Sequence, residues 1–230
     1  MKKRLSLLLL LLVQYATFAQ TAQEVLTASG NAFRDNEYLS MEVAVYNYAT
    51  STSAGVLVGR GSMSKSNDGY YSKFMNDELI SNKHCTVILN HDAKSMVCFT
   101  GEKQKRRNRQ VGTSPDSMAR PGDSLVYMGE ENGMKRVIIY HKNSYFLRTE
   151  LFLSAATSLP SRIVYYHVPE NDEFTTDAWK TEILYEKISF EKPTGDLFSE
   201  EKYVEKKNGT WVATPAFKNY KLTVSETPEQ

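Results

Sequence analysis

The sequence has few of the residues on which covalent or metal chemistry depends. It contains two cysteines and four histidines in 230 residues, and it has no Gly-x-Ser-x-Gly nucleophile motif. The histidines are scattered and follow no triad order: His84, His91, His141 and His167. The first two, taken with the cysteines, lack the paired short spacings of zinc modules. We therefore expect no catalytic residue, no metal and no cofactor, and a protein that is not an enzyme.

Long apolar runs are missing after the first residues. The run Leu5–Val13 follows a basic head, Met1–Arg4, and precedes small residues at Thr17 and Ala19. This order is typical of a bacterial signal peptide, and the run is shorter than the ~20 residues that span a bilayer. We expect residues 1–19 to be cleaved, and no cysteine stands at the cleavage point to carry a lipid anchor. The predicted location is the periplasm, with an extracellular location as the alternative.

A strong excess of either charge is also absent. The chain has 28 basic and 27 acidic residues, and loss of the leader would leave 25 and 27. A near-neutral protein of this kind is not expected to bind nucleic acid. Residues 20–230 are long enough for one large domain, and we expect a single domain and a monomer.

The chain itself predicts one helix followed by strands. Residues 22–38 have apolar residues at helical spacing behind Thr21, a plausible N-cap. Alternating or β-rich stretches then recur at short intervals: 39–50, 55–66, 70–74, 124–128, 135–140, 145–153, 159–167 and 181–190. Turn signals stand at Asp68-Gly69, Asn132-Gly133 and Asn208-Gly209. The expected fold is mainly β (α+β): a strongly curved antiparallel half-barrel of about ten strands, with the helix and a small helical cap.

The stretch 85–99 holds both cysteines and is predicted to form a hairpin. A two-residue loop at His91-Asp92 would pair Cys85 with Cys98 and permit a disulfide, whereas a three-residue loop would place them on opposite faces. A four-residue loop, His91 to Lys94, would keep them on one face but out of line. Since His-Asp lacks the glycine or asparagine that a two-residue loop favours, we expect the four-residue loop. The disulfide remains open.

Three stretches resemble the lipoprotein-localisation factor family, the LolA/LolB-like periplasmic carriers. The first is the opening helix with Met41-Glu-Val-Ala-Val45, Gly55-Val-Leu-Val58 and Gly69-Tyr-Tyr-Ser-Lys-Phe74. The second is Leu159-Pro-Ser-Arg-Ile-Val-Tyr165, which is similar to a proline-led strand of the family. The third, Lys187–Phe198, is similar to its late strand and D-x-L-F element. The family's arginine-proline pair has no counterpart, because Gly61 follows Arg60.

The resemblance implies a carrier that holds acyl chains of a lipid or lipidated protein in an apolar cavity on the concave sheet face. The alternating residues expected to line it are Met41, Val43, Val45, Val58, Tyr70, Phe74, Leu147 and Leu151. The alternative is a cell-envelope interaction or structural module of the same fold, in which these residues fill an ordinary core.

A basic cluster interrupts the β pattern, with five cationic side chains in seven residues. These are Lys103, Lys105, Arg106, Arg107 and Arg109. The cluster is a candidate for transient contact with phospholipid headgroups or an acidic envelope protein, since each basic residue near an anionic surface contributes about 1 kcal/mol. A solvated loop with no partner is the competing interpretation.

Overall fold

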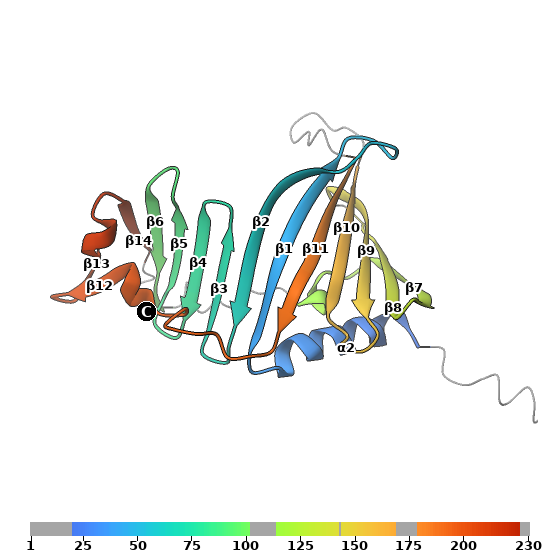
Figure 1. Cartoon of the computed structure of the whole chain (residues 1–230), viewed down its shortest axis with the longest axis horizontal. Coiled ribbons are helices and arrows are strands. Elements are labelled where there is room, and N and C mark those ends of the chain that lie inside the picture. The colour runs from blue at the N-terminus through green and yellow to red at the C-terminus, as the bar shows by residue number, and fades with distance from the viewer. Residues whose placement is uncertain (1–19, 102–113, 143, 169–178, 226–230) are drawn as a thin grey trace, which may run out of the picture.

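The computed structural model describes residues 20–101, 114–142, 144–168 and 179–225. The predicted leader, the basic cluster and residues 169–178 lie outside these ranges. Figure 1 shows one broad sheet with a helix, α2, along one half and a C-terminal segment at the other end. The helix is α2 (Ala22–Asp35), and the strands are β1 (Leu39–Tyr48), β2 (Val56–Lys65), β3 (Gly69–Phe74), β4 (Asp77–Asn82), β5 (Thr86–Asn90), β6 (Ser95–Phe99), β7 (Ser124–Glu131), β8 (Met134–Tyr140), β9 (Phe146–Ser154), β10 (Pro160–His167), β11 (Lys180–Ser189), β12 (Val204–Lys207), β13 (Thr210–Ala213) and β14 (Lys221–Ser225).

Twelve of the strands form one open sheet in the order β14-β6-β5-β4-β3-β2-β1-β11-β10-β9-β8-β7. All neighbours are antiparallel except β14 and β6, which are parallel. The mainly β, antiparallel fold is thus confirmed, and the expected count of about ten strands is too low: fourteen lie in the described residues. The strands without a sequence signal include β4, where Glu78 occupies a buried position and breaks the apolar alternation.

Helix α2 begins where the sequence predicts and ends earlier. The Thr21 side chain accepts a hydrogen bond from Glu24 N, and the Glu24 carboxylate accepts one from Thr21 N, which completes a capping box. The helix stops at Asp35 rather than residue 38, and the Asn36 side chain donates to the Ala32 carbonyl at 2.6 Å. That bond satisfies a carbonyl that the ending helix leaves open.

The two faces of the sheet are covered at opposite ends. The face that carries α2 is here called the inner face. Ala22, Val25 and Leu26 of the helix pack there against strands β8, β9 and β10, through Val137, Ile139, Leu151, Leu153 and Ile163. Phe33 packs nearby against Leu39, Met41 and Leu159. The helix therefore covers the inner face of the β7–β11 half and reaches β1.

The C-terminal segment, which follows β11, covers the β4–β6 half of the sheet. It lies on the side opposite α2, which we call the outer face. Tyr203 and Val204 pack on the outer-face residues of β4, β5 and β6, which are Ile80, Val87, Leu89, Met96 and Cys98, together with Cys85 just ahead of β5. Short 3-10 turns lie at Pro115–Ser117, Glu200–Lys202 and Pro215–Phe217. Strand β14 then pairs with β6 and occupies that edge.

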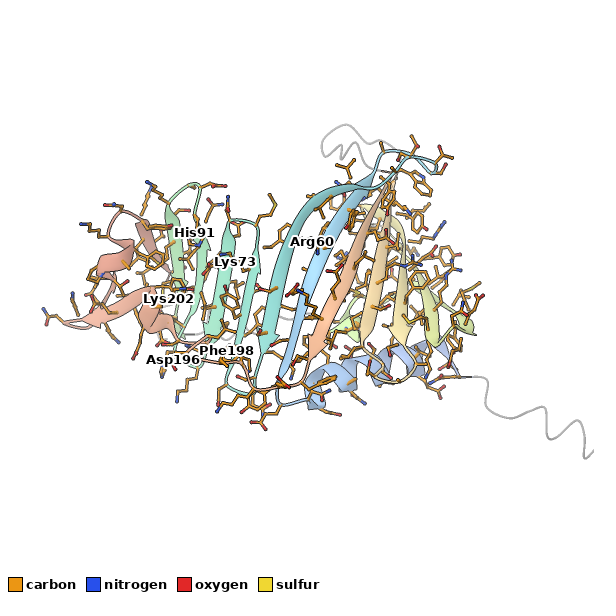
Figure 2. The ribbon with its side chains drawn as sticks, viewed as in Figure 1. Arg60, Lys73, His91, Asp196, Phe198 and Lys202 are labelled. Atoms are coloured by element: carbon orange, nitrogen blue, oxygen red, sulfur yellow. The ribbon has the colours of Figure 1, made fainter. Side chains whose placement is uncertain are left out.

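Two of the three predicted glycine turns have the expected backbone. Asn132-Gly133 and Asn208-Gly209 join β7 to β8 and β12 to β13 with positive φ at all four residues. Asp68-Gly69 does not: neither residue has positive φ, and Gly69 is the first residue of β3. A Cβ on Gly69 would lie 2.7 Å from Cβ of Phe198, so the glycine permits the close approach of the segment seen around Asp196 and Phe198 in Figure 2.

A buried carboxylate fixes the C-terminal segment to the sheet. The Tyr203 hydroxyl donates to Glu78 Oε2 at 2.7 Å, and Lys73 Nζ lies 3.3 Å from Glu78 Oε1. Figure 2 shows Lys73 of β3, His91 of the β5–β6 loop and Lys202 of this segment near one another. Burial raises the pKa of Glu78, but the hydrogen bonds from Tyr203 and Lys73 outweigh it and hold the pKa below its ordinary value.

Replacing Gly61 should destabilise the sheet, because the backbone of β3 and the Phe74 side chain lie too close for a Cβ at this position. A Cβ there would lie 2.4 Å from the Lys73 carbonyl oxygen and 2.9 Å from Phe74 Cδ2. We expect Gly61→Ala to lower the free energy of unfolding by about 1–3 kcal/mol in urea titrations. The neighbouring Ser62→Ala, a half-buried position on the outer face, is the control and should change it by less than about 0.5 kcal/mol. Equal stability of the two variants would contradict this packing.

Tyr203→Phe should destabilise the protein and make it more sensitive to acid. Removing one hydrogen bond to a buried carboxylate costs about 1–3 kcal/mol at neutral pH. Because the pKa of Glu78 is lowered in the fold, its stabilisation is present above the unfolded pKa and is lost as pH falls through the folded pKa. In the variant this loss should start at higher pH. Urea unfolding at several pH values measures this loss of stability, and Tyr71→Phe is the control. If Tyr203→Phe and wild type have the same stability at every pH, the Tyr203–Glu78 hydrogen bond does not stabilise the fold.

Candidate functional site

A strip of half-buried side chains crosses the inner face beside α2. The cross-strand pairs Val43–Tyr185, Val45–Ile183 and Met41–Met63 place these strands' odd-numbered residues on one face. Gly61 pairs with Phe74 and Lys65 with Tyr70, which continues the face onto β3. We call this set the inner-face strip: Val43, Val45, Met63, Tyr70, Phe74, Ile183 and Tyr185, all half-buried. It combines apolar surface with partial access to solvent.

The eight residues predicted to line a cavity fall into three groups. Val43, Val45, Tyr70 and Phe74 belong to the inner-face strip. Met41 and Leu151 lie on the same face but are fully buried in the core beneath α2. Val58 and Leu147 are 41% and 51% exposed.

Val58 and Leu147 each occupy the extra position of a β-bulge. On β2, Gly59 pairs with Val45 and Leu57 with Tyr46, so Val58 has no partner. On β9, Arg148 pairs with Tyr166 and Phe146 with His167, which leaves out Leu147. An extra residue changes the side to which the following residues point. Phe146 takes the inner position instead, and its ring centroid lies 4.8 Å from that of Tyr165.

Tyrosine hydroxyls add polar groups to this apolar face. Burial raises the pKa of Tyr70, of Tyr165 and of Tyr185, and the neighbouring Tyr165 and Tyr70 raise that of Tyr185 further. All three are therefore neutral phenols at neutral pH. A neutral phenol presents a ring to apolar groups and keeps one O–H for a polar contact.

A cavity lined mainly by polar residues lies at the end of the strip where β2 turns into β3. Its volume is about 340 Å³. Phe33 of α2 forms one side and Tyr70 another, and the other lining residues are Lys65, Ser66, Asn67, Asp68, Gly69, Ser81, Asn82 and Lys83. We call it the Lys65 cavity. Tyr70 is the member of the inner-face strip that also lines it.

The cysteine hairpin has the expected four-residue loop. Asn90 pairs with Ser95, so His91–Lys94 form the loop and Val87, not Cys85, lies opposite Cys98. Both cysteines are buried free thiols within the core under the C-terminal segment. A hydrogen bond with Cys98, and then burial, raise the pKa of the Cys85 thiol above its ordinary value. Neither thiol resembles a reactive site, because reactive cysteines are exposed and have a lowered pKa.

A carboxylate, a histidine and a hydroxyl are aligned at the ends of β7 and β8, which the sequence did not indicate. Asp123 Oδ2 lies 3.0 Å from His141 Nδ1, and His141 Nε2 lies 2.7 Å from Thr149 Oγ1. Asp123 also accepts hydrogen bonds from the backbone N–H groups of Arg120 and Lys142. Thr149 is 1% exposed, so its hydroxyl is out of reach of a substrate. The arrangement joins the segment before β7 to the β8–β9 loop.

Metal-ligand clusters and membrane-spanning helices are both absent from the part of the chain that the structure describes. No group of three or more potential metal ligands was found there. None of the helices in those residues has the length and apolar character needed to cross a membrane.

Comparison with known proteins gives similarity in structure without similarity in sequence. No family model matches the chain, and no curated protein matches it. An uncharacterized conserved protein from Thermus thermophilus is 12% identical, with 90% of this chain and 100% of that chain covered and a TM-score of 0.52. At this identity the likeness concerns the fold alone.

The similar structures include the family that the sequence motifs resemble. The LolA superfamily protein NE2245 from Nitrosomonas europaea is 11% identical, covering 80% of this chain and 99% of its own, with a TM-score of 0.34. A putative outer membrane lipoprotein-sorting protein domain from Vibrio parahaemolyticus is 12% identical, covering 76% and 95%, also at 0.34. Scores this low carry no argument about what the present chain binds.

The two thiols should be unreactive until the protein unfolds. Both are buried, and the raised pKa leaves almost no Cys85 thiolate at neutral pH. We expect Ellman's reagent to detect neither thiol in the native protein and two thiols per chain in urea without reductant. Detection of none in urea would instead demonstrate a disulfide between Cys85 and Cys98.

Proposed function

We propose that the protein is an exported carrier of the cell envelope that binds an acyl chain of a lipid or lipidated protein against its inner face. The observation that carries the proposal is the inner-face strip, an apolar surface beside α2 that is only half-buried. The resemblance of three sequence stretches to the lipoprotein-localisation carriers supports it, as does the leader pattern in residues 1–19. Binding is non-covalent and requires no catalytic residue.

The energetics favour an acyl ligand on this strip. Each methylene moved from water onto an apolar surface contributes about 0.8 kcal/mol. Roughly ten buried methylenes would contribute about 8 kcal/mol before the cost of ordering the chain is subtracted. Val43, Val45 and Ile183 offer aliphatic contact, and Phe74 and Tyr185 offer ring faces.

The envelope interaction module without a ligand is the second candidate. It is favoured by the position of the Phe74 side chain, which lies over β2 where Gly59 and Gly61 lack side chains. In this function the ring completes a filled inner face, and the protein acts through its surface. The basic residues 103–109 serve in either case as a proposed contact for anionic headgroups or an acidic partner, and the protein acts as a monomer.

Binding of a fluorescent fatty acid tests the carrier function. The protein lacking residues 1–19 should bind cis-parinaric acid saturably, and Val45→Gln should weaken binding about tenfold because it places an amide in the strip. Tyr46→Gln is the matched control: Tyr46 is the next residue on β1 and points to the outer face. It should stay within twofold of wild type. Both variants are first checked for wild-type thermal unfolding.

The alternative outcomes separate the two candidates. If no saturable binding is found with the wild-type protein, the carrier proposal is wrong and the ligand-free module stands. If both variants lose affinity equally, the ligand does not lie on the inner face.

A further inference from the structure

We propose that the Lys65 cavity binds the anionic head group of the acyl ligand, a carboxylate or a phosphate, with Lys65 as its counter-charge. The inference deepens the carrier function and rests on it. Three features support it: the burial of Lys65, the composition of the cavity, and its position at the end of the inner-face strip.

Lys65 is a buried lysine whose charge is only partly compensated. The residue is 9% exposed, and its Nζ donates to the carbonyl oxygens of Arg34 and Asn36 at 3.1 and 2.6 Å. These carbonyls stand at the C-terminal end of α2, where the helix dipole favours a cation. They account for two of its three N–H donors, and the Phe33 ring lies 5.8 Å from Nζ.

A carboxylate partner for Lys65 is not seen. Among the ion pairs within the described residues, none involves Lys65, and Asp35 acts on it only as a nearby charge. Burial lowers the pKa of Lys65, which shows that its surroundings disfavour the cation. A lysine is rarely buried unless it is paired. An anion in the adjacent cavity would supply the missing charge and accept the third N–H.

The other lining residues suit a small oxyanion. Lys83 adds a second cation, and Asp68 is the acidic residue of the lining, so the sum is one positive charge. Ser66, Asn67 and Ser81 bring hydroxyl and amide groups to the same lining. A volume of about 340 Å³ is at the small end of the range for ligand pockets and suits a head group rather than a whole lipid.

The cavity and the strip share Tyr70 and lie along the same pair of strands, β2 and β3. Lys65 lies opposite Tyr70, Met63 opposite Ser72, and Gly61 opposite Phe74. From Lys65 to Gly61 the strand β2 rises about 13 Å, at ~3.3 Å per residue. A ligand with its head group at Lys65 would therefore lay its first methylenes along Met63 toward Phe74 and Val43. One end of the site is charged and the rest is apolar, so the ligand that fits it is an anionic amphiphile.

Three ligands with the same chain and different head groups test the proposal. Dodecanoate, dodecyl phosphate and dodecanol are each titrated against bound cis-parinaric acid. We expect one or both anions to bind the wild-type protein at least tenfold more tightly than dodecanol. Tighter binding of dodecanoate would identify a fatty acid carboxylate as the head group, and tighter binding of dodecyl phosphate would identify a phospholipid phosphate. Lys65→Met should reduce both anions to the affinity of dodecanol and leave dodecanol unchanged.

Lys73→Met is the matched control, since Lys73 lies on β3 with its side chain on the outer face. It should retain the preference for anions. If Lys65→Met does not fold, NMR of the wild-type protein tests the head-group site. The backbone amide resonances of Gly69, Ser81 and Lys83 should shift with dodecanoate and not with dodecanol.

Two results would overturn the proposal and are distinguishable. Equal affinity for all three ligands in wild type, without shifts of those amides, refutes the head-group site and leaves the carrier function intact. If none of the three ligands binds the protein or displaces cis-parinaric acid, the carrier function itself is refuted.

Discussion

The pairing of β1 with β11 is the contact on which the rest of the structure depends. It joins two antiparallel meanders, β1–β6 and β7–β11, that are otherwise separate in the sheet order. Its register places Val43 opposite Tyr185 and Val45 opposite Ile183, so residues about 140 positions apart in the chain share one face. A slip of one residue would turn these side chains to the outer face. The inner-face strip exists because this register holds.

The two faces of the β1–β11 region differ strongly in polarity. On the outer face of β8–β11, Glu150 is buried and bonded to Arg136 at 2.7 Å and Arg148 at 3.0 Å. Arg162 lies 3.3 Å from Glu182, which also accepts the Tyr48 hydroxyl. Buried carboxylates of this kind require their partners, and an apolar ligand would separate them at high cost. The proposed acyl ligand would therefore fit the inner face and not the outer face.

The sequence predicted the parts of the fold that local chemistry determines. Thr21 is the N-cap of α2, and two Asn-Gly turns have the backbone that those residues favour. The four-residue loop at His91–Lys94 followed from the absence of a suitable two-residue turn. Each of these depends on residues within a few positions of one another, so the sequence alone is sufficient.

The features that were missed depend on residues far apart in the chain. Gly69 is required by Phe198 rather than by a turn, and Glu78 occupies a buried strand position because Tyr203 supplies its hydrogen bond. Bulges at Val58 and Leu147 cannot be seen in a strict alternation, so the sequence does not indicate the exposure of either residue. Lys65 was not singled out, since an isolated lysine carries no signal until the end of α2 is placed beside it.

The position of β1 in the sheet also has a consequence for the time at which the protein can fold. The first strand of the chain lies at the centre and cannot gain its second neighbour before β11, which ends at Ser189, is available. The core beneath the C-terminal segment and the β14–β6 pair need residues up to 225. Contacts of such long range close slowly. A growing chain therefore stays without its central pair until most of it has been made, and such late folding would be compatible with the proposed export across a membrane.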